Sequence, residues 1–267
     1  MRLNIKGLTL VELMIAMVIS LVVFGLIYQA YQAQQRARTR EQLVVDMQQN
    51  ARSALAFMRR ELRMAGYDPK ESGNFGFKSA GIGEVRFTLD LNADGLENND
   101  NEDITYWLSD GDLKRSNKNA ERPLAYDIVA VAFAYAFDND AVDKPGHGDL
   151  DTYPGSPDGI VIWAYASDSD IGKKLDRHLD TNKDGVIDAS DIPGDHNLSS
   201  VGGVADIDQD KIRAVRVWLL ARTRSPIPGY VDNETYVVGG QLVTPNNSYK
   251  HCLLEGMVLC RNMGASD

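Results

Sequence analysis

The first 28 residues constrain this chain more than any other part of its sequence. A leader with the basic residues Arg2 and Lys6 precedes an apolar segment, residues 8–28, whose one charged residue is Glu12. As a helix this segment would be about 31 Å long, which matches a bilayer hydrocarbon core of roughly 30 Å. The sequence therefore predicts a membrane-spanning helix over residues 8–30, with the basic leader on the cytoplasmic side.

Glu12 needs an explanation, because a carboxylate within a bilayer costs about 2.5–3.5 kcal/mol on insertion scales. One interpretation is a polar residue at the rim of the membrane, where the cost is smaller. The other is a carboxylate that is kept for a positively charged partner inside a protein assembly. A cleaved secretory signal is disfavoured, because such signals have a shorter apolar core and a small-residue cleavage site after it.

The segment Lys6–Leu13, with the sequence KGLTLVEL, resembles the class III leader of type IV pilins and of type II secretion pseudopilins. The resemblance implies cleavage after Gly7 by a prepilin peptidase and N-methylation of the new first residue, Leu8. Family members most often have Phe or Met at that position, so Leu8 is a mild departure. The resemblance also implies that Glu12 neutralises the free amino terminus of a neighbouring subunit. Two opposite charges are less costly in hydrocarbon as a pair than alone.

A helical pattern continues beyond the apolar segment, over residues 31–66. No proline interrupts it, and Gly66 followed by Pro69 predicts its end. Four arginines lie largely off its apolar face, which favours packing on a globular domain over a lone coiled coil. The apolar positions recur at steps of three and four: Val44, Met47, Ala51, Ala54, Met58, Leu62 and Ala65.

The charges of the chain are unevenly distributed. Residues 1–66 hold nine Lys or Arg and four Asp or Glu, whereas residues 67–267 hold 19 and 34. So acidic a domain argues against nucleic-acid binding. Its pattern is that of many short strands, which after one long helix predicts an α+β fold with an antiparallel sheet. The predicted strands are 84–89, 104–108, 113–115, 128–137, 160–166, 212–223 and 253–261.

More narrowly, the chain resembles PilW-type minor pilins and J-type minor pseudopilins. The resemblance rests on the end of the helix, residues 48–52 and 57–67, and on loose motifs at residues 103–108, 215–217 and 258–262. It implies a type IV pilin-like fold of four parts: a leader (1–7), a transmembrane helix (8–30), an amphipathic helix (31–66) and a β-rich domain (67–267).

The function that this resemblance implies is assembly of a type IV pilus, as a priming or tip subunit. The implied partners are other major and minor pilins, the prepilin peptidase and the inner-membrane assembly platform. The implied location is the inner membrane, with the domain in the periplasm, and then the pilus at the cell surface. Two alternatives stay open: a minor pseudopilin of a type II secretion system, and a calcium-dependent adhesin at the pilus tip. We expect no catalytic residues.

One segment of the acidic domain matches a calcium loop of twelve residues, from Asp180 to Asp191. Oxygen-bearing side chains occupy the ligand positions, Gly185 stands where the backbone must turn, and Ile187 would anchor the loop to the core. A terminal Asp in place of Glu resembles dockerin-type loops. The sequence therefore predicts Ca²⁺ as a cofactor, against the alternative of a solvated turn. The ligands would be Asp180, Asn182, Asp184, the Val186 carbonyl, Asp188 and Asp191.

A weaker copy of this loop begins with Asp90, Asn92, Asp94 and Gly95, between two predicted strands. The residues at its ninth and twelfth positions, Asn98 and Asn101, are uncharged. Asp100, Glu102 or Asp103 would have to replace them if the loop is irregular. Metal binding and a plain hairpin loop are both open here.

Other polar residues are interpreted more simply. The alternating aspartates 206, 208 and 210, and likewise 138, 140 and 143, are expected to be solvated edge charges, and His178 a surface residue. The two cysteines, Cys252 and Cys260, are expected to form a disulfide, because an oxidising periplasm permits one. This bond requires a bend at Gly256, since a straight strand would hold the two Cα atoms about 26 Å apart.

Overall fold

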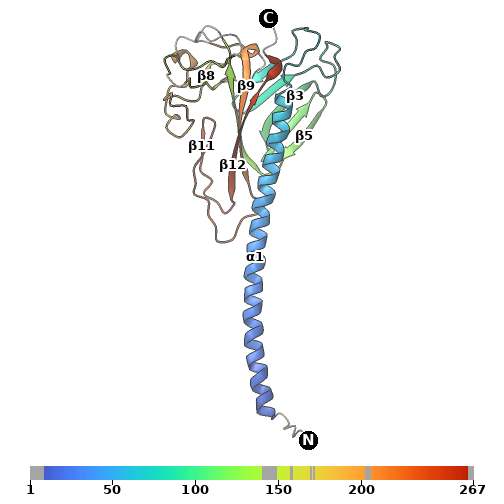
Figure 1. Ribbon diagram of the computed structural model, residues 1–267, viewed down its shortest axis with the longest axis vertical. Coiled ribbons are helices and arrows are strands. Elements are labelled where there is room, and N and C mark those ends of the chain that lie inside the picture. The colour runs from blue at the N-terminus through green and yellow to red at the C-terminus, as the bar shows by residue number, and fades with distance from the viewer. Residues whose placement is uncertain are drawn as a thin grey trace, which may run out of the picture. The chain divides into compact units, whose positions relative to one another are not determined.

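The computed structural model describes residues 9–139, 149–156, 159–168, 170, 172–201 and 206–263. These residues form one long helix followed by many short strands (Figure 1). Contacts divide the chain into two compact units, residues 1–45 and residues 46–267. The helix α1, Leu10–Leu62, belongs to both units.

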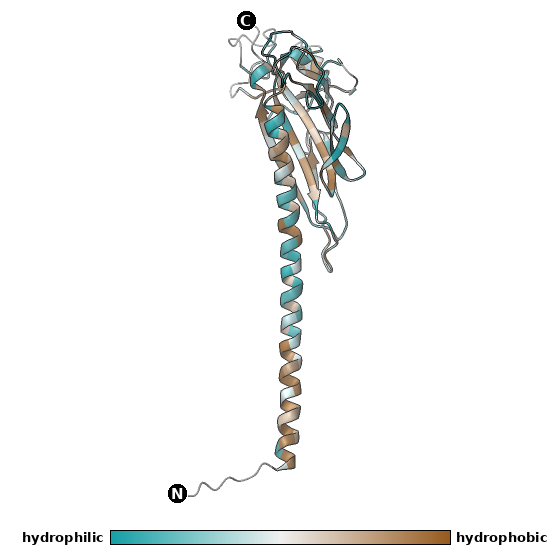
Figure 2. Ribbon diagram, turned by 90° about the vertical axis from the view of Figure 1, so that its right-hand side faces the viewer, coloured by the Kyte–Doolittle hydropathy of each residue, from teal (hydrophilic) through white to brown (hydrophobic). Residues whose placement is uncertain are grey.

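In the first unit, the apolar side chains of α1 are exposed from Leu10 to Tyr31. Figure 2 shows this end of the helix as an almost continuous hydrophobic band. Among the described residues, α1 is the one helix that is long and apolar enough to cross a membrane. Exposed apolar surface of this extent is unstable in water, and a bilayer would cover it.

In the second unit, one face of α1 is buried in the globular domain. The helix ends at Leu62, four residues before the predicted end at residue 66, and a turn leads to Gly66. Gly66 has a φ of +73°, and its N–H donates to the Thr88 carbonyl at 3.0 Å. The predicted apolar face is confirmed apart from the half-buried Val44, and Leu55 joins it. Its buried residues are Met47, Ala51, Ala54, Leu55, Met58, Leu62 and Ala65.

Two antiparallel sheets follow the helix. The first has the order β1-β2-β3-β4-β5, so neighbours in sequence pair in space. A tight turn with Asp110 at φ +56° and Gly111 at φ +78° joins the third and fourth strands. Positive φ at both central residues is typical of the type I′ turns of β-hairpins. The strands are β1 Phe77–Ala80, β2 Glu84–Thr88, β3 Asp103–Ser109, β4 Asp112–Asn117 and β5 Ala120–Ala125.

The second sheet has the order β12-β9-β6-β7-β8, with the longest strands, β6 and β9, side by side in its interior. Their apolar runs are typical of strands that are buried on both faces. The strands are β6 Ile128–Phe137, β7 Ala164–Tyr165, β8 Arg177–His178, β9 Ile212–Arg222 and β12 His251–Leu259, with a separate hairpin of β10 Tyr236–Val238 and β11 Gln241–Val243. Three short 3₁₀ helices complete the fold: η1 Leu198–Ser200, η2 Gln209–Lys211 and η3 Arg261–Met263.

The predicted α+β class with antiparallel sheets is confirmed. The predicted strand 160–166 is mostly irregular, because only Ala164–Tyr165 pairs there as a strand. At Gly256 the helix lies so close to β12 that an added Cβ would be 3.3 Å from the Leu55 side chain. Glycine at this position therefore permits the close approach of helix and sheet.

The expected disulfide is wrong, because Cys252 and Cys260 are both free. β12 runs from His251 to Leu259 in unbroken register with β9, so Gly256 causes no bend. A straight strand keeps residues eight apart at about 26 Å, far beyond the range of a disulfide. Burial raises the pKa of the Cys260 thiol to about 12.

Candidate functional site

Glu12 lies in the first turn of α1, and its carboxylate turns back onto Thr9. The Thr9 N–H donates to Glu12 Oε2 at 2.8 Å and the Thr9 hydroxyl at 2.9 Å, while the Glu12 N–H donates to the hydroxyl at 3.3 Å. This reciprocal arrangement is a capping box, which satisfies free N–H groups at a helix start. The T-x-x-E pattern could have indicated Thr9 from the sequence. The predicted cleavage site, Gly7 and Leu8, lies outside the described residues.

The backbone of the predicted calcium loop is held in a tight turn by hydrogen bonds to the loop's own carboxylates. Asp180 accepts the N–H groups of Asp184 at 3.2 Å and of Gly185 at 2.8 Å. Asp184 in turn accepts the N–H of Val186 at 2.8 Å. Lys183 at φ +62° and Gly185 at φ +87° allow this tight winding. The winding brings the oxygen-bearing side chains at the first, third and fifth positions to one side of a single turn.

Asp191 closes the loop from its far end. It accepts the N–H groups of Thr181 at 2.7 Å and of Asp188 at 2.9 Å. Asp180 and Asp191 are 1% and 2% exposed, so two carboxylates are buried in one loop. Burial raises the pKa of Asp180, and the nearby charge of Asp191 raises it further, against hydrogen bonds from Gly185 and Lys183 that lower it. Two buried anions in one loop favour the binding of a positive ion.

The residues beneath the loop are buried. The Tyr153 hydroxyl donates to the Asp180 carbonyl at 2.7 Å and lies 3.1 Å from His178 Nδ1. His178 was expected at the surface, but it is 1% exposed, because the chain pairs β8 with β7 and folds the loop over it. Burial lowers the pKa of His178 and therefore favours its neutral form. Ile187 packs against the hydrophobic core, as the loop pattern predicts.

The loop that begins at Asp90 repeats this hydrogen-bond pattern position by position, between β2 and β3. Asp90 accepts the N–H groups of Asp94 at 3.2 Å and of Gly95 at 2.9 Å. Asp94 accepts the N–H of Leu96 at 2.7 Å. Ala93 at φ +58° and Gly95 at φ +77° match Lys183 and Gly185 of the first loop. The two loops thus share these three hydrogen bonds and a positive φ at the fourth and sixth positions.

Glu102 is the acid that closes the Asp90 loop, one position later than in the first loop. It accepts the N–H groups of Leu91 at 3.2 Å and of Asn98 at 3.1 Å, the same second and ninth positions that Asp191 holds. Glu102 and Asp90 are both fully buried. Burial alone would raise the pKa of Glu102, but hydrogen bonds from Asn99 and Asn98 lower it below its usual value.

A surface hollow of about 440 Å³ lies beside the Asp90 loop. Its lining is rich in amides and consists of Leu91, Asn92, Asn98, Asn99, Asp100 and Asn101. Over the described residues no three His, Cys, Asp or Glu side chains are grouped closely enough to hold a metal. A cation in either loop would therefore need the Asn side chain at the third position and the backbone carbonyl at the seventh.

The other predicted acidic residues have different environments. Asp206, Asp208 and Asp210 are exposed, as expected. Asp138 was expected to be solvated but is 7% exposed, and its carboxylate lies 3.9 Å from Arg213 Nε. The end of β6 is covered there by Lys211, whose carbonyl accepts the Asp138 N–H. Residues 140 and 143 lie outside the described part of the chain.

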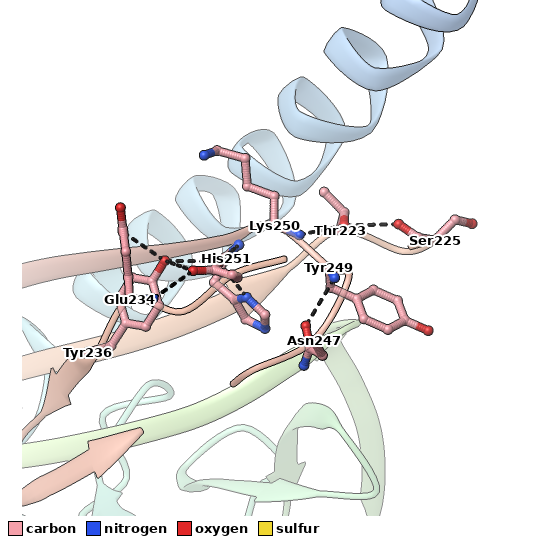
Figure 3. Close-up of polar contacts among 9 residues, drawn as sticks. Thr223, Ser225, Glu234, Tyr236, Asn247, Tyr249, Lys250 and His251 are labelled. Atoms are coloured by element: carbon pink, nitrogen blue, oxygen red, sulfur yellow. Dashed lines mark hydrogen bonds and ion pairs between the residues drawn. The ribbon is translucent and has the colours of Figure 1, made fainter. Parts of the chain in front are cut away.

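Sequence reasoning missed a buried pair that joins two segments of the second unit. His251 Nδ1 lies 2.9 Å from Asp232 Oδ2, and both side chains have no exposed surface. The Tyr236 hydroxyl donates to the same carboxylate at 3.1 Å, and so does the His251 N–H. Figure 3 shows the side chains of Tyr236 and His251 close together, with dashed lines for the polar contacts around them. The pair attaches the segment between β9 and β12 to the start of β12.

Comparison with known proteins supports the reading of the N-terminus. The profile described as the prokaryotic N-terminal methylation motif matches residues 2–28. No curated protein sequence matches the chain. Among solved structures, a type IV-like pilin from Thermus thermophilus is similar with 14% identity and a TM-score of 0.39, over 79% of this chain and 94% of that chain. So distant a similarity carries no argument by itself. The chain therefore carries the N-terminal methylation motif of type IV prepilin-like proteins, and this motif includes the first part of a helix that is long and apolar enough to cross a membrane.

Proposed function

We propose that this protein is a PilW-like minor pilin that performs no catalysis. It would either prime the assembly of a type IV pilus or form part of the pilus tip. The observation that carries the proposal is the methylation motif over residues 2–28, with Glu12 in the first turn of an apolar helix. The prepilin peptidase would cleave after Gly7 in the inner membrane, with the globular domain in the periplasm. The mature chain would then join other pilins at the assembly platform.

The capping box supports a role for Glu12 in this assembly. Thr9 satisfies the Glu12 carboxylate within one chain and so lowers the cost of keeping it in the bilayer before assembly. A carboxylate has room for about four acceptor interactions, so an incoming amine can bind without displacing Thr9. The free amino terminus of the neighbouring subunit would supply that amine.

The Glu12→Ala variant tests this mechanism. We expect it to insert in the membrane normally but to be missing from sheared filaments, with Glu41→Ala, which alters an exposed acid of the same helix, as the matched control. Equal incorporation of both variants would contradict the proposal. Mass spectrometry of the mature protein should find a methylated Leu8 as its first residue. If the chain is recovered with secretion machinery and not with pili, it is the pseudopilin of the alternative interpretation.

We further propose that Ca²⁺ orders the two aspartate loops. Oxygen ligands from side chains at the first, third and fifth positions and a carbonyl at the seventh suit this hard cation, and Asp191 or Glu102 would close the site. The cation would offset the buried negative charge that each loop carries. Binding should raise the melting temperature of the full chain in detergent, and a chelator should reverse the rise. An unchanged melting temperature would remove this part of the proposal.

An adhesive role is the second candidate, favoured by the amide-lined hollow beside the Asp90 loop. A calcium ion there would bring free coordination sites next to hydrogen-bonding amides, which suits a polyhydroxylated ligand. A glycan array probed with and without calcium tests it. Binding that is lost in Glu102→Gln would support the adhesin, and no bound glycan would contradict it.

A further inference from the structure

The part of α1 in the second unit carries four exposed arginines that form no ion pair with any residue that the structure describes. Arg52, Arg59, Arg60 and Arg63, here called the arginine stripe, are all exposed. At about 100° per residue they lie between the edge of the buried face and the side away from it, over roughly 17 Å of helix length. The Arg59 side chain borders β12, because its Cδ would be 3.4 Å from a Cβ added at Gly256. Within the described part of the chain none of the four forms an ion pair, although Arg60 lies over the Phe57 ring at 5.1 Å.

The same unit carries the complementary charge on a different surface. Residues 149–211 contain 14 Asp and no Glu, against five Lys or Arg. Two segments of this region, 172–175 and 206–210, lie side by side through reciprocal Leu175 and Ile207 backbone hydrogen bonds of 2.9 Å. Gln209 adds a side-chain hydrogen bond of 2.6 Å to the Lys173 carbonyl.

Three exposed carboxylates, two on the second segment and one near the start of the first, have no ion pair among the described residues. Lys173 and Lys174 pair instead with the neighbouring Asp168 and Asp208, at 3.7 Å and 3.1 Å. The three that are left, here called the aspartate ridge, are Asp170, Asp206 and Asp210. Stripe and ridge thus present opposite charges, and no ion pair between them forms within one chain.

We propose that the arginine stripe of one subunit docks on the aspartate ridge of a second copy of this chain. The proposal rests on the assembly function above, and it supplies a contact between globular domains besides the membrane helices. Guanidinium groups bind carboxylates through paired hydrogen bonds. Contact between the arginine stripe and the aspartate ridge would therefore neutralise charge on both surfaces and define how the two subunits are aligned. The two surfaces differ, so the contact is head-to-tail, and it leaves one stripe and one ridge unoccupied on the two copies that it joins.

Charge exchange between the two surfaces tests this contact directly. Full-length chains with donor or acceptor dyes would be reconstituted in phosphatidylcholine vesicles, with energy transfer reporting their association. Arg59→Glu with Arg63→Glu should weaken association about tenfold, and so should Asp170→Lys with Asp210→Lys. A mixture of these two double variants should recover the wild-type level, because each then offers the charge that the other lacks. Raising the salt to about 1 M should abolish the difference, since screening then acts within about 3 Å.

The matched control is Arg122→Glu with Arg224→Glu, the same change of charge at exposed arginines outside the stripe. If this control weakens association equally, net charge alone is responsible and the proposal fails. Failure of the mixture to recover association would show that the stripe does not meet the ridge. Loss of binding to vesicles with anionic phospholipid, with self-association unchanged, would make the stripe a lipid contact. None of these outcomes affects Leu8 processing, so the proposed pilin function would be tested separately.

Discussion

Glu61 of α1 accepts two parallel hydrogen bonds from the guanidinium of Arg115 in β4, each 2.9 Å long. The Tyr106 hydroxyl of β3 donates to the same carboxylate. The side chains of Glu61 and Arg115 are 14% and 16% exposed, so the pair is mostly withdrawn from water. Burial raises the pKa of Tyr106 above its usual range, and the charge of Glu61 raises it further, which keeps its hydroxyl a donor. This network joins the helix to the first sheet.

Removal of one partner should destabilise the second unit strongly. In Glu61→Ala the Arg115 charge stays buried without its acceptor, and we expect the free energy of unfolding to fall by about 3 kcal/mol. Arg63→Ala, an exposed position two residues further along the chain, should change it by less than about 0.5 kcal/mol. Urea titration of the full chain in detergent, followed by tryptophan fluorescence, measures both.

A double variant separates the ion pair from simple packing. Glu61→Leu with Arg115→Leu removes both charges, and we expect it to be more stable than either single variant. If the double variant is as unstable as the sum of the two single variants, the pair is not coupled and the network does not hold the helix.

The long elements could be predicted from the sequence because their patterns are local. The apolar face of α1 and the apolar runs of β6 and β9 indicate which side chains become buried. β5 could not be predicted, because its sequence AERPLA is half-exposed, polar and contains Pro123. It is a strand because β4 offers an edge with which to pair, and such pairing depends on tertiary context.

The candidate site could be predicted in part for a similar reason. The spacing from Asp180 to Asp191 follows the twelve-residue rule, so the sequence indicates both ends of the loop. Glu102 breaks that rule by one residue, and only the folded backbone shows which of three nearby acids closes the loop. Asp232 and His251 are 19 residues apart and match no motif, so no local pattern indicates their contact.

The two loops should bind calcium independently. Asp180→Ala should remove the part of the calcium-dependent rise in melting temperature that comes from the first loop. Glu102→Gln should remove the part that comes from the second loop. Each variant should keep part of the rise, because the other loop is intact, and the double variant should show none. Asp170→Ala, an exposed aspartate outside both loops, is the control and should retain the full rise. A full rise in the double variant would place the calcium elsewhere.

Acidification should release calcium from the Asp180 loop first. Burial raises the pKa of Asp180, so a proton competes with the cation at a higher pH than at an ordinary aspartate, above about pH 4. In the Asp90 loop, hydrogen bonds lower the pKa of Glu102, and its charge persists to lower pH. Calorimetric titration between about pH 4 and pH 7 should therefore show a steeper loss of affinity in Glu102→Gln, which keeps the first loop, than in Asp180→Ala. The reverse order would contradict this assignment.

The buried Asp232–His251 pair should contribute stability that depends on pH. Burial alone would raise the pKa of Asp232, but the hydrogen bonds from His251, Glu234 and Tyr236 lower it below its usual value. A lowered pKa in the folded state gives stability that is fully present above about pH 4 and is lost as the pH falls through the folded value. Asp232→Asn should therefore lower the free energy of unfolding by roughly 1–3 kcal/mol at neutral pH.

The deficit of Asp232→Asn relative to the wild type should narrow below about pH 4, where the wild-type carboxyl itself takes up a proton. Asp170→Asn changes an exposed carboxylate instead and should leave stability unaltered at every pH. Thermal unfolding of the full chain in detergent, from about pH 3 to pH 7, measures all three proteins. A deficit that stays constant down to the lowest pH would mean that the amide disturbs packing and that the Asp232 charge contributes nothing. A deficit that grows on acidification would reverse the sign of the linkage and exclude a lowered pKa.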